Sequence, residues 1–258
     1  MLNEIIENKL KEVELLKSTL DISSIDLSSK KNDFYKKLLN NQNKKDNSII
    51  AEVKRKSPSK GVLVEDLNIT ETVSAYESGG ATCVSVLTEK DYFNGSNDDL
   101  TKVKNIIELP VLRKDFMLDP IQIYESKMLG ADCVLLIVSA LTKFMFKELH
   151  ELSIRLNLDV LVEVHDQSEL DFALSQNSKL IGVNNRDLKT FNVDINTSID
   201  LSSSVTEKNI VLVSESGIHH RNDIERLNAA GIYTFLIGEH LVKSQNIINE
   251  LGELIHGK

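Results

Sequence analysis

Short apolar runs recur along the chain, and many of them are rich in the β-branched residues that favour buried strands. They span residues 48–53, 82–87, 110–113, 132–138, 159–164, 180–183, 209–213 and 233–237. The stretches between them carry helix signals. Asp119 before Pro120 is typical of a helix start, and Phe146, Leu149 and Leu152 follow the spacing of one helix face. The pattern predicts eight strands that alternate with helices.

A faint internal repeat supports this number of strands. In residues 78–84 and 128–134, a glycine is followed three positions later by Cys83 or Cys133, and residues 229–235 are a looser copy. Each copy is typical of a helix end, a left-handed glycine and a buried strand. The alternation predicts an α/β fold, namely a parallel (β/α)8 barrel. An open doubly wound sheet is the alternative, although its glycine-rich first turn does not occur in the sequence.

The first 45 residues precede the first predicted strand. The spacing of one apolar helix face is seen at Leu10, Val13, Leu16 and Leu20. We predict one barrel domain over residues 1–258, in which residues 1–45 form a helical extension packed on the barrel.

Composition narrows the functional classes. A net charge of −9 argues against general nucleic-acid binding. No apolar run reaches the ~18 residues of a membrane span, and the acidic, amphipathic start of the chain does not resemble a signal peptide. Cys83 and Cys133 lie in apolar runs, as expected for buried free thiols in a reducing compartment. We expect a cytoplasmic protein without nucleic-acid or membrane partners.

Charged and amide side chains gather where the predicted strands end. Glu52 and Lys54 lie two positions apart, so a strand directs both side chains to one face. Glu163 lies late in the fifth run, and His165 follows it where the strand is expected to give way to a loop. The other polar ends are Lys114, Asn184, Arg186, Glu215, Ser216 and, after the last strand, Glu239.

These strand ends would form the catalytic face of a parallel barrel. Two lysines and three glutamates in one mouth would shift each other's protonation, which suits acid–base chemistry. The simpler alternative is that each charge merely closes a strand, with Glu52 and Lys54 as a surface ion pair.

Two glycine turns indicate a phosphate site. Ser216-Gly217 and Gly238-Glu239 follow the seventh and eighth predicted strands, where barrels often bind phosphate through backbone N–H groups. Arg186 and Lys54 would supply positive charge. Two ordinary glycine turns are the alternative.

Five segments resemble motifs of the indole-3-glycerol-phosphate synthase family and occur in the family's order. They are residues 50–61 (IAEVKRKSPSKG), 87–96 (LTEKDYFNGS), 112–116 (LRKDF), 182–188 (GVNNRDL) and 214–218 (SESGI). The N-terminal extension is also similar to that of the family. The resemblance implies a (β/α)8 barrel that acts in tryptophan biosynthesis on a small phosphorylated substrate, 1-(2-carboxyphenylamino)-1-deoxyribulose 5-phosphate. Ring closure with loss of carbon dioxide and water would give indole-3-glycerol phosphate, without a metal or an organic cofactor.

The resemblance also implies roles for individual residues. Lys114 would be the general acid at the ribulose carbonyl, Lys54 would pair with the substrate carboxylate, and Glu163 would carry a proton during dehydration. The side chains that orient these groups would be Glu52, Asn184, Glu215 and Ser216. The phosphate would be held by Ser57, Arg186, Gly217 and Gly238, and the aromatic ring by Phe93, Phe116, Leu135 and Leu188. Which lysine gives the decisive proton at each step stays open, and Glu239, where some relatives carry Ser or Thr, should point away from the phosphate.

Two other functions stand as alternatives. A phosphoribosylanthranilate isomerase is also a phosphate-binding barrel, but its relatives lack the long N-terminal extension and the paired Glu52 and Lys54. The chain could instead be a non-catalytic module whose N-terminal helix associates with another tryptophan-pathway enzyme. We expect that deletion of residues 1–45 destabilises the barrel and weakens closure on the substrate.

Overall fold

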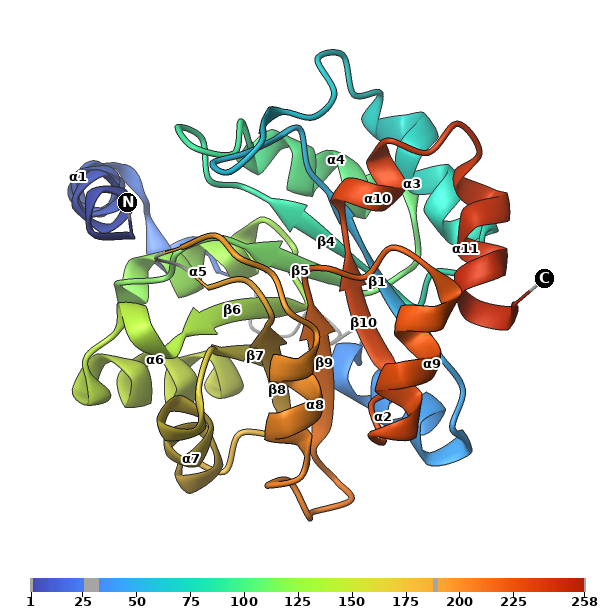
Figure 1. Cartoon of the computed structure of the whole chain (residues 1–258). Helices are drawn as coiled ribbons and strands as arrows, with labels where there is room; N and C mark the ends of the chain where they lie inside the picture. The colour runs from blue at the N-terminus through green and yellow to red at the C-terminus, as the bar shows by residue number, and fades with distance from the viewer. Residues whose placement is uncertain (1, 26–32, 188–189, 258) are drawn as a thin grey trace.

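The computed structural model describes residues 2–25, 33–187 and 190–257. Within these residues, eight parallel strands close into a barrel, which confirms the predicted fold (Figure 1). In chain order they are β1 (Ser48–Val53), β4 (Cys83–Leu87), β5 (Val111–Lys114), β6 (Cys133–Ile137), β7 (Asp159–Val164), β8 (Leu180–Asn184), β9 (Val211–Glu215) and β10 (Thr234–Ile237). A short antiparallel pair, β2 (Lys56–Ser57) and β3 (Gly61–Val62), stands in the loop after β1.

Three strands extend further than the apolar runs predict. The last residues of β5, β8 and β9 are Lys114, Asn184 and Glu215. These side chains find ion pairs or hydrogen bonds inside the barrel mouth. Because each of these side chains has a polar partner there, the strand ladder continues through them.

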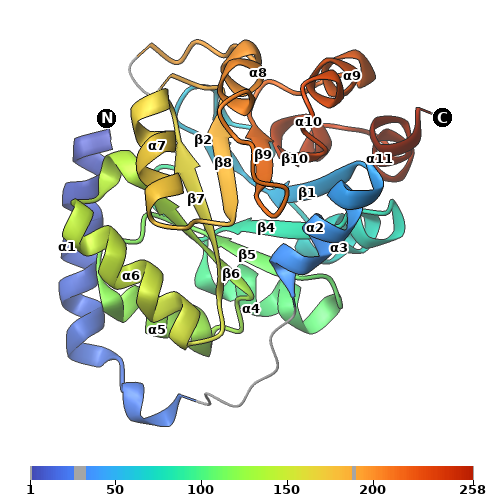
Figure 2. The same cartoon turned by 90° about the horizontal axis from the view of Figure 1, so that it is seen from below.

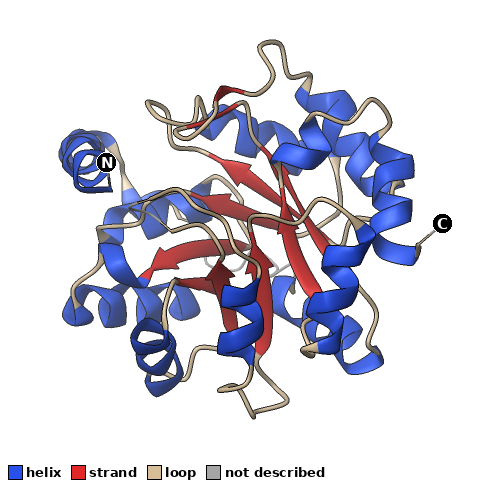
Figure 3. Ribbon diagram, viewed as in Figure 1, coloured by secondary structure: helices blue, strands red, loops and turns tan. Residues whose placement is uncertain are grey.

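Helices cover the outside of the barrel (Figure 3). They are α3 (Ile69–Ser78), α4 (Asn97–Ile106), α5 (Pro120–Met128), α6 (Lys143–Arg155), α7 (Gln167–Ser175), α8 (Asn196–Ser202), α9 (Arg221–Ala229) and α11 (Ile247–His256), with the short α10 (Glu239–Val242), η1 (Ile22–Ser24) and η2 (Val138–Ala140). As the sequence predicts, α5 starts after Asp119, which forms a capping box with Gln122. The predicted face of α6 is also buried at Phe146, Leu149 and Leu152.

The core has two layers, one on each face of the strands. In β1, Ile50 belongs to the layer inside the barrel, whereas Ile49 and Ala51 belong to the layer under the helices. Cys83 and Cys133 lie in the inner layer as free, buried thiols. Burial raises the pKa of both thiols, so they stay protonated and pack as small apolar groups.

Helix α2 (Phe34–Lys44) closes the amino-terminal end of the barrel. Phe34 and Leu38 are fully buried and join the inner layer of the core. The Tyr35 hydroxyl donates to the backbone carbonyl of Asn209 at 2.5 Å. The second helix of the extension therefore binds to a segment that comes late in the chain.

Helix α1 (Leu2–Thr19) runs along the outside of the barrel and packs beside α5 (Figure 2). Its buried residues are Ile5, Lys9 and Val13, each one turn from the next. The predicted apolar face is wrong at Leu10, which is 47% exposed. The helix is rotated so that Lys9 can reach a buried acid, described below. No helix in the described part of the chain combines the length and the apolar character that crossing a membrane requires.

Candidate active site

The polar strand ends meet at the carboxyl end of the barrel. Because side chains alternate between the two faces of a strand, Ile50 in the interior places Glu52, and then Lys54, on the same side. The same step of two leads from Leu112 to Lys114. It also directs into the mouth the side chains of Glu163, Asn184 and Glu215.

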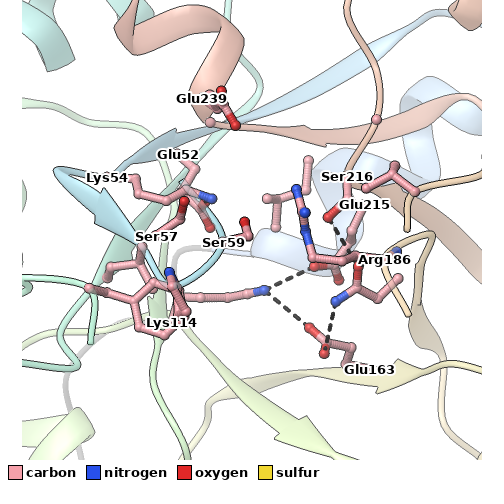
Figure 4. Close-up of a pocket in the computed structure, with 18 of the residues that line it drawn as sticks. Glu52, Lys54, Ser57, Ser59, Lys114, Glu163, Arg186, Glu215, Ser216 and Glu239 are labelled. Atoms are coloured by element: carbon pink, nitrogen blue, oxygen red, sulfur yellow. Dashed lines mark hydrogen bonds and ion pairs between the residues drawn. The ribbon is translucent and has the colours of Figure 1, made fainter. Parts of the chain in front are cut away.

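These side chains line one cavity of about 390 Å³ (Figure 4). Every predicted site residue that the structure describes is part of its wall: Glu52, Lys54, Ser57, Phe93, Lys114, Phe116, Leu135, Glu163, Asn184, Arg186, Glu215, Ser216, Gly217 and Gly238. Leu188, the remaining predicted residue, lies outside the described residues.

Lys114 lies at the centre of the charged groups. Its Nζ atom is 2.9 Å from Glu215 Oε2 and 3.2 Å from Glu163 Oε2 (Figure 4). Burial would lower the pKa of Lys114, but the carboxylates of Glu215, Glu163 and Glu52 raise it above its ordinary value. The ammonium group is therefore held as a cation that can stabilise a negative oxygen.

Glu163 is held from several sides. Besides meeting Lys114, its Oε1 atom accepts a hydrogen bond from Asn184 Nδ2 at 3.3 Å and lies 3.4 Å from His165 Nε2. Burial would raise the pKa of Glu163, but Lys114 and His165 hold it below its ordinary value. Burial also opposes the charge of His165, but Glu163 and Glu169 raise its pKa to about 10. His165 thus adds a second cation beside Glu163, which the sequence indicates only through its spacing.

Glu215 has the opposite shift. Burial raises the pKa of Glu215 to about 7, because Lys114 offsets only part of that effect and Glu163 adds a like charge. Its Oε1 atom is buried and has no hydrogen-bond partner among the described residues. A Cβ atom on Gly182 would lie 2.1 Å from this oxygen, so the glycine leaves the space that the carboxylate fills.

Glu215 should make the protein less stable as the pH rises. Its folded-state pKa of about 7 lies above the ordinary value of 4.5, so its proton favours the folded state. This stabilisation is complete below the ordinary value and is lost as the pH rises through the folded-state value. In Glu215→Gln, the free energy of unfolding in urea should therefore depend less on pH between about 5 and about 8. Glu225→Gln, at an exposed carboxylate of α9, is the control, and equal pH dependence in both variants would contradict the assignment.

Glu52 and Lys54 form a close ion pair on the other side of the mouth. Lys54 Nζ is 2.5 Å from Glu52 Oε1, and Ser85 Oγ donates to the other oxygen at 3.3 Å. Burial would raise the pKa of Glu52, but Lys54 and Lys114 hold it below its ordinary value. Since Glu52 is only 2% exposed, the pair belongs to the cavity, and the alternative of a surface ion pair does not describe it.

The wall of the same cavity also offers groups that suit an anion. Ser216 and Gly217 follow β9 with φ angles of 69° and 81°. Ser57 Oγ is buried and has no hydrogen-bond partner among the described residues. Arg186 adds a guanidinium to the same cavity. Backbone N–H groups, a hydroxyl and a guanidinium are the donors that proteins use for phosphate.

Glu239 stands at the rim of the cavity and is neutralised by two lysines. Its Oε1 atom is 2.9 Å from Lys60 Nζ and 2.8 Å from Lys243 Nζ. Figure 4 shows Glu239 on the far side of the cavity from Glu163. A carboxylate paired in this way repels a nearby anion much less than a free one does.

An apolar wall completes the cavity. The rings of Phe93 and Phe116 lie 6.4 Å apart with their planes at 40°. Sequence reasoning missed Leu2 and Ile5 of α1, which also line the cavity. The period of an amphipathic helix predicts that it packs but not where it packs, so no local signal could place them here.

One group of potential metal-ligating side chains lies outside this site. Among the described residues, the carboxylates of Glu12, Glu89 and Asp91 have oxygens within 4.8 Å of one another. The group is not part of the cavity wall, and Glu89 already accepts hydrogen bonds from the backbone N–H groups of Tyr92 and Phe93. It therefore adds nothing to the chemistry of the cavity.

A family model for indole-3-glycerol phosphate synthase matches residues 2–254. The chain belongs to the indole-3-glycerol phosphate synthase family. The indole-3-glycerol phosphate synthase of Desulfosudis oleivorans is 49% identical over 207 residues, which cover 80% of this chain and 78% of that protein. The one of Carboxydothermus hydrogenoformans is 49% identical over 196 residues, 76% of this chain and 74% of that protein. The resemblance based on five motifs is confirmed.

Solved structures of other proteins have the same barrel fold as this member of the indole-3-glycerol phosphate synthase family, at much lower sequence identity. A 3-hexulose-6-phosphate synthase superposes with a TM-score of 0.62 at 12% identity, covering 80% of this chain and 97% of its own. A thiamine phosphate pyrophosphorylase from Pyrococcus furiosus gives 0.59 at 15% identity, with 81% and 94% covered. These likenesses support the fold alone.

Proposed function

We propose that this chain converts 1-(2-carboxyphenylamino)-1-deoxyribulose 5-phosphate into indole-3-glycerol phosphate. A bond forms between the ring carbon that carries the carboxylate and the carbonyl carbon of the ribulose. Carbon dioxide then leaves that ring carbon, and the former carbonyl oxygen leaves as water. One observation supports the proposal: Lys114 and the carboxylates of Glu163 and Glu215 face the same cavity as hydrogen-bond donors that suit an anion and as an apolar wall.

The charged groups have distinct proposed roles. Lys114 protonates the carbonyl oxygen during ring closure and assists its later departure, because its ammonium is held at the centre of the mouth. Lys54 pairs with the substrate carboxylate, since its side chain is 20% exposed above the buried Glu52. Glu163 carries a proton during dehydration, because its ionised carboxylate reaches Lys114. The groups that orient these three are Glu52, Asn184, Glu215 and Ser216.

Substrate binding uses the two ends of the cavity. The proposed phosphate contacts are Ser57, Arg186, Gly217 and Gly238, and the proposed ring contacts are Phe93, Phe116, Leu135 and Leu188. With both ends fixed, the two carbons that must join are held together, and positioning supplies much of the rate. Binding energy from the phosphate offsets the cost of bending the substrate.

The direct test is to mix the purified protein with the carboxyphenylamino substrate and to follow indole fluorescence. The sequence contains no tryptophan, so the background is low. Product formed with release of carbon dioxide supports the proposal, and a folded protein that forms none refutes it. A parallel assay with phosphoribosylanthranilate tests the isomerase alternative.

Arg186→Met should raise KM for the phosphorylated substrate by roughly tenfold or more, since a charge-assisted hydrogen bond contributes about 1.5–3 kcal/mol. The same variant should weaken competitive inhibition by inorganic phosphate. Steady-state kinetics with and without phosphate provide the measurement. Arg226→Met is the control, because Arg226 is exposed on α9 and bonds to Asn196 away from the cavity. An unchanged KM in Arg186→Met would remove this residue from the phosphate site.

Three further properties are proposed on the family resemblance. The chain forms one barrel domain with residues 1–45 as its extension. The protein acts in the cytoplasm. Association with other tryptophan-pathway enzymes stays a prediction, which co-purification with those enzymes would test.

A further inference from the structure

Lys9 is a lysine in an unusual place, on a face of α1 that is otherwise apolar. It is 3% exposed, and its Nζ atom lies 3.0 Å from Asp115 Oδ1 and 2.7 Å from Glu12 Oε2. The Asp115 side chain is only 2% exposed. The Arg113 guanidinium also lies 3.6 Å from Asp115 Oδ2, so Lys9 is the nearer of two buried cations beside this carboxylate. A buried charge that loses a close partner is very unfavourable, so Lys9 and Asp115 stabilise each other.

Asp115 occupies a sensitive position in the chain. It lies between Lys114, which faces the cavity, and Phe116, which belongs to the apolar wall. One carboxylate oxygen accepts a hydrogen bond from the Phe116 backbone N–H at 2.8 Å, and the other accepts one from Thr88 Oγ1 at 2.6 Å. The carboxylate thus binds the backbone that follows it directly. It reaches Lys114 through Thr88, whose backbone N–H donates to the Lys114 carbonyl at 3.1 Å.

Other contacts of α1 point to the same loops. Leu2 and Ile5 line the cavity directly. Asn8 Nδ2 donates to the Tyr92 hydroxyl at 3.1 Å, and Tyr92 precedes Phe93 of the apolar wall. Helix α1 thus contacts the loops that carry both aromatic residues of the proposed ring site.

We propose that Lys9 is a positioning residue for the reaction. Its ion pair with Asp115 fixes α1 against the segment after β5 and so sets where Lys114 and Phe116 stand. Lys9 itself touches neither the substrate nor the reacting atoms. The expected kinetic effect rests on the proposed function. The positions of Lys114 and Phe116 do not, because they can be measured without turnover.

A second ion pair on α1 provides a control, because it attaches the helix to the barrel without contacting Asp115. Lys17 Nζ lies 2.7 Å from Asp119 Oδ2, with the lysine side chain 44% exposed. It joins α1 to the same connection between β5 and α5, but further from Lys114. An exposed pair contributes little to stability, so Lys17→Met is a matched control on one helix and one loop.

The experiment compares four variants with the wild type in steady-state kinetics. Lys9→Met should raise KM and lower kcat, each by roughly tenfold, because small displacements of reacting groups are costly. Lys17→Met should keep both constants. Lys9→Arg should recover most of the loss, since a cavity of about 150 Å³ beside Lys9 and Asp115 gives room for a guanidinium. Lys9→Met/Asp115→Asn should be less impaired than Lys9→Met, because the two paired charges are removed together and Arg113 keeps its closer ion pair with Glu125 at 2.6 Å.

The readouts distinguish positioning from loss of folded protein. A purely structural role would lower the concentration of active enzyme and hence the apparent kcat, leaving KM unchanged, and would overturn the inference. Crystal structures of Lys9→Met and Lys17→Met give the second measurement. Displaced Lys114 and Phe116 in Lys9→Met alone support the inference, whereas unmoved side chains overturn it whether or not the wild type turns over the substrate. A wild type without turnover refutes the proposed function instead.

Discussion

Replacing Lys114 with methionine should lower kcat by at least about 100-fold, the usual effect of removing a general acid. Methionine keeps much of the side-chain length but has no proton to give and no charge to stabilise the carbonyl oxygen. The measurement is single-turnover and steady-state formation of indole-3-glycerol phosphate, with the folded fraction checked by circular dichroism. A variant that retains most of its kcat would remove Lys114 from the central role.

The Lys114→Met variant should also change the pH dependence of stability. Without the ammonium, the buried carboxylates of Glu163 and Glu215 lose their shared cation, and their folded-state pKa values should rise. A raised folded-state pKa means that stability is lost as the pH increases. The kinetics of the variant should therefore be measured at slightly acidic to neutral pH, where it stays folded. Lys104→Met is the control. Lys104 is partly buried and pairs with Asp132 at 2.6 Å outside the cavity, so its loss should lower stability and leave kcat near the wild-type value.

Glu163→Gln should also lower kcat by about 100-fold or more, since an amide cannot carry the proton that dehydration requires. The variant keeps the size of the side chain and one oxygen to accept from Asn184, so KM should change little. Rapid-quench measurement of the dehydration step would locate the loss after ring closure. Normal release of carbon dioxide with slow appearance of the indole is the expected pattern.

A control for Glu163 is available on the far side of His165. Glu169 contacts Nδ1 of the same ring at 3.1 Å, and it is not part of the cavity wall. Glu169→Gln removes one negative neighbour from His165, as Glu163→Gln does, but leaves the proposed proton carrier in place. Equal losses in the two variants would assign the effect to His165 and not to the carboxylate of Glu163.

The alternation of side chains along a strand explains why so much of the site could be predicted. Once residues 48–53 are assigned as a strand, the apolar residues around Glu52 decide which face is interior, and the Glu52 side chain must lie on that face. The repeat also carried physical information, because Gly80 and Gly130 have φ angles of 87° and 83° after their helices. These signals are local, so they can be recognised without knowing the fold.

The contribution of α1 could not be predicted in the same way. Leu10 is apolar and exposed, whereas Lys9 is charged and buried. The partner that makes burial of Lys9 favourable is Asp115, in a distant part of the chain. Helical spacing ranks faces by apolar content and cannot anticipate an ion pair that tertiary structure creates. The same limit explains why Leu2 and Ile5 were not predicted as part of the cavity.

The way α2 seals the barrel has a consequence for the order in which the protein assembles on the ribosome. Phe34 and Leu38 are synthesised early, and Asn41 of α2 finds a partner soon after in Ser48, at 3.0 Å, but other groups that hold α2 in place come much later. The Tyr35 hydroxyl donates its hydrogen bond to the carbonyl of Asn209, and the Gln42 side-chain amide donates to that of Ile210 at 2.9 Å, so both bonds form only after these residues are made. Helix α2 therefore cannot complete its contacts until β9 has been synthesised, and closure of the amino-terminal end of the barrel is a late event in biogenesis.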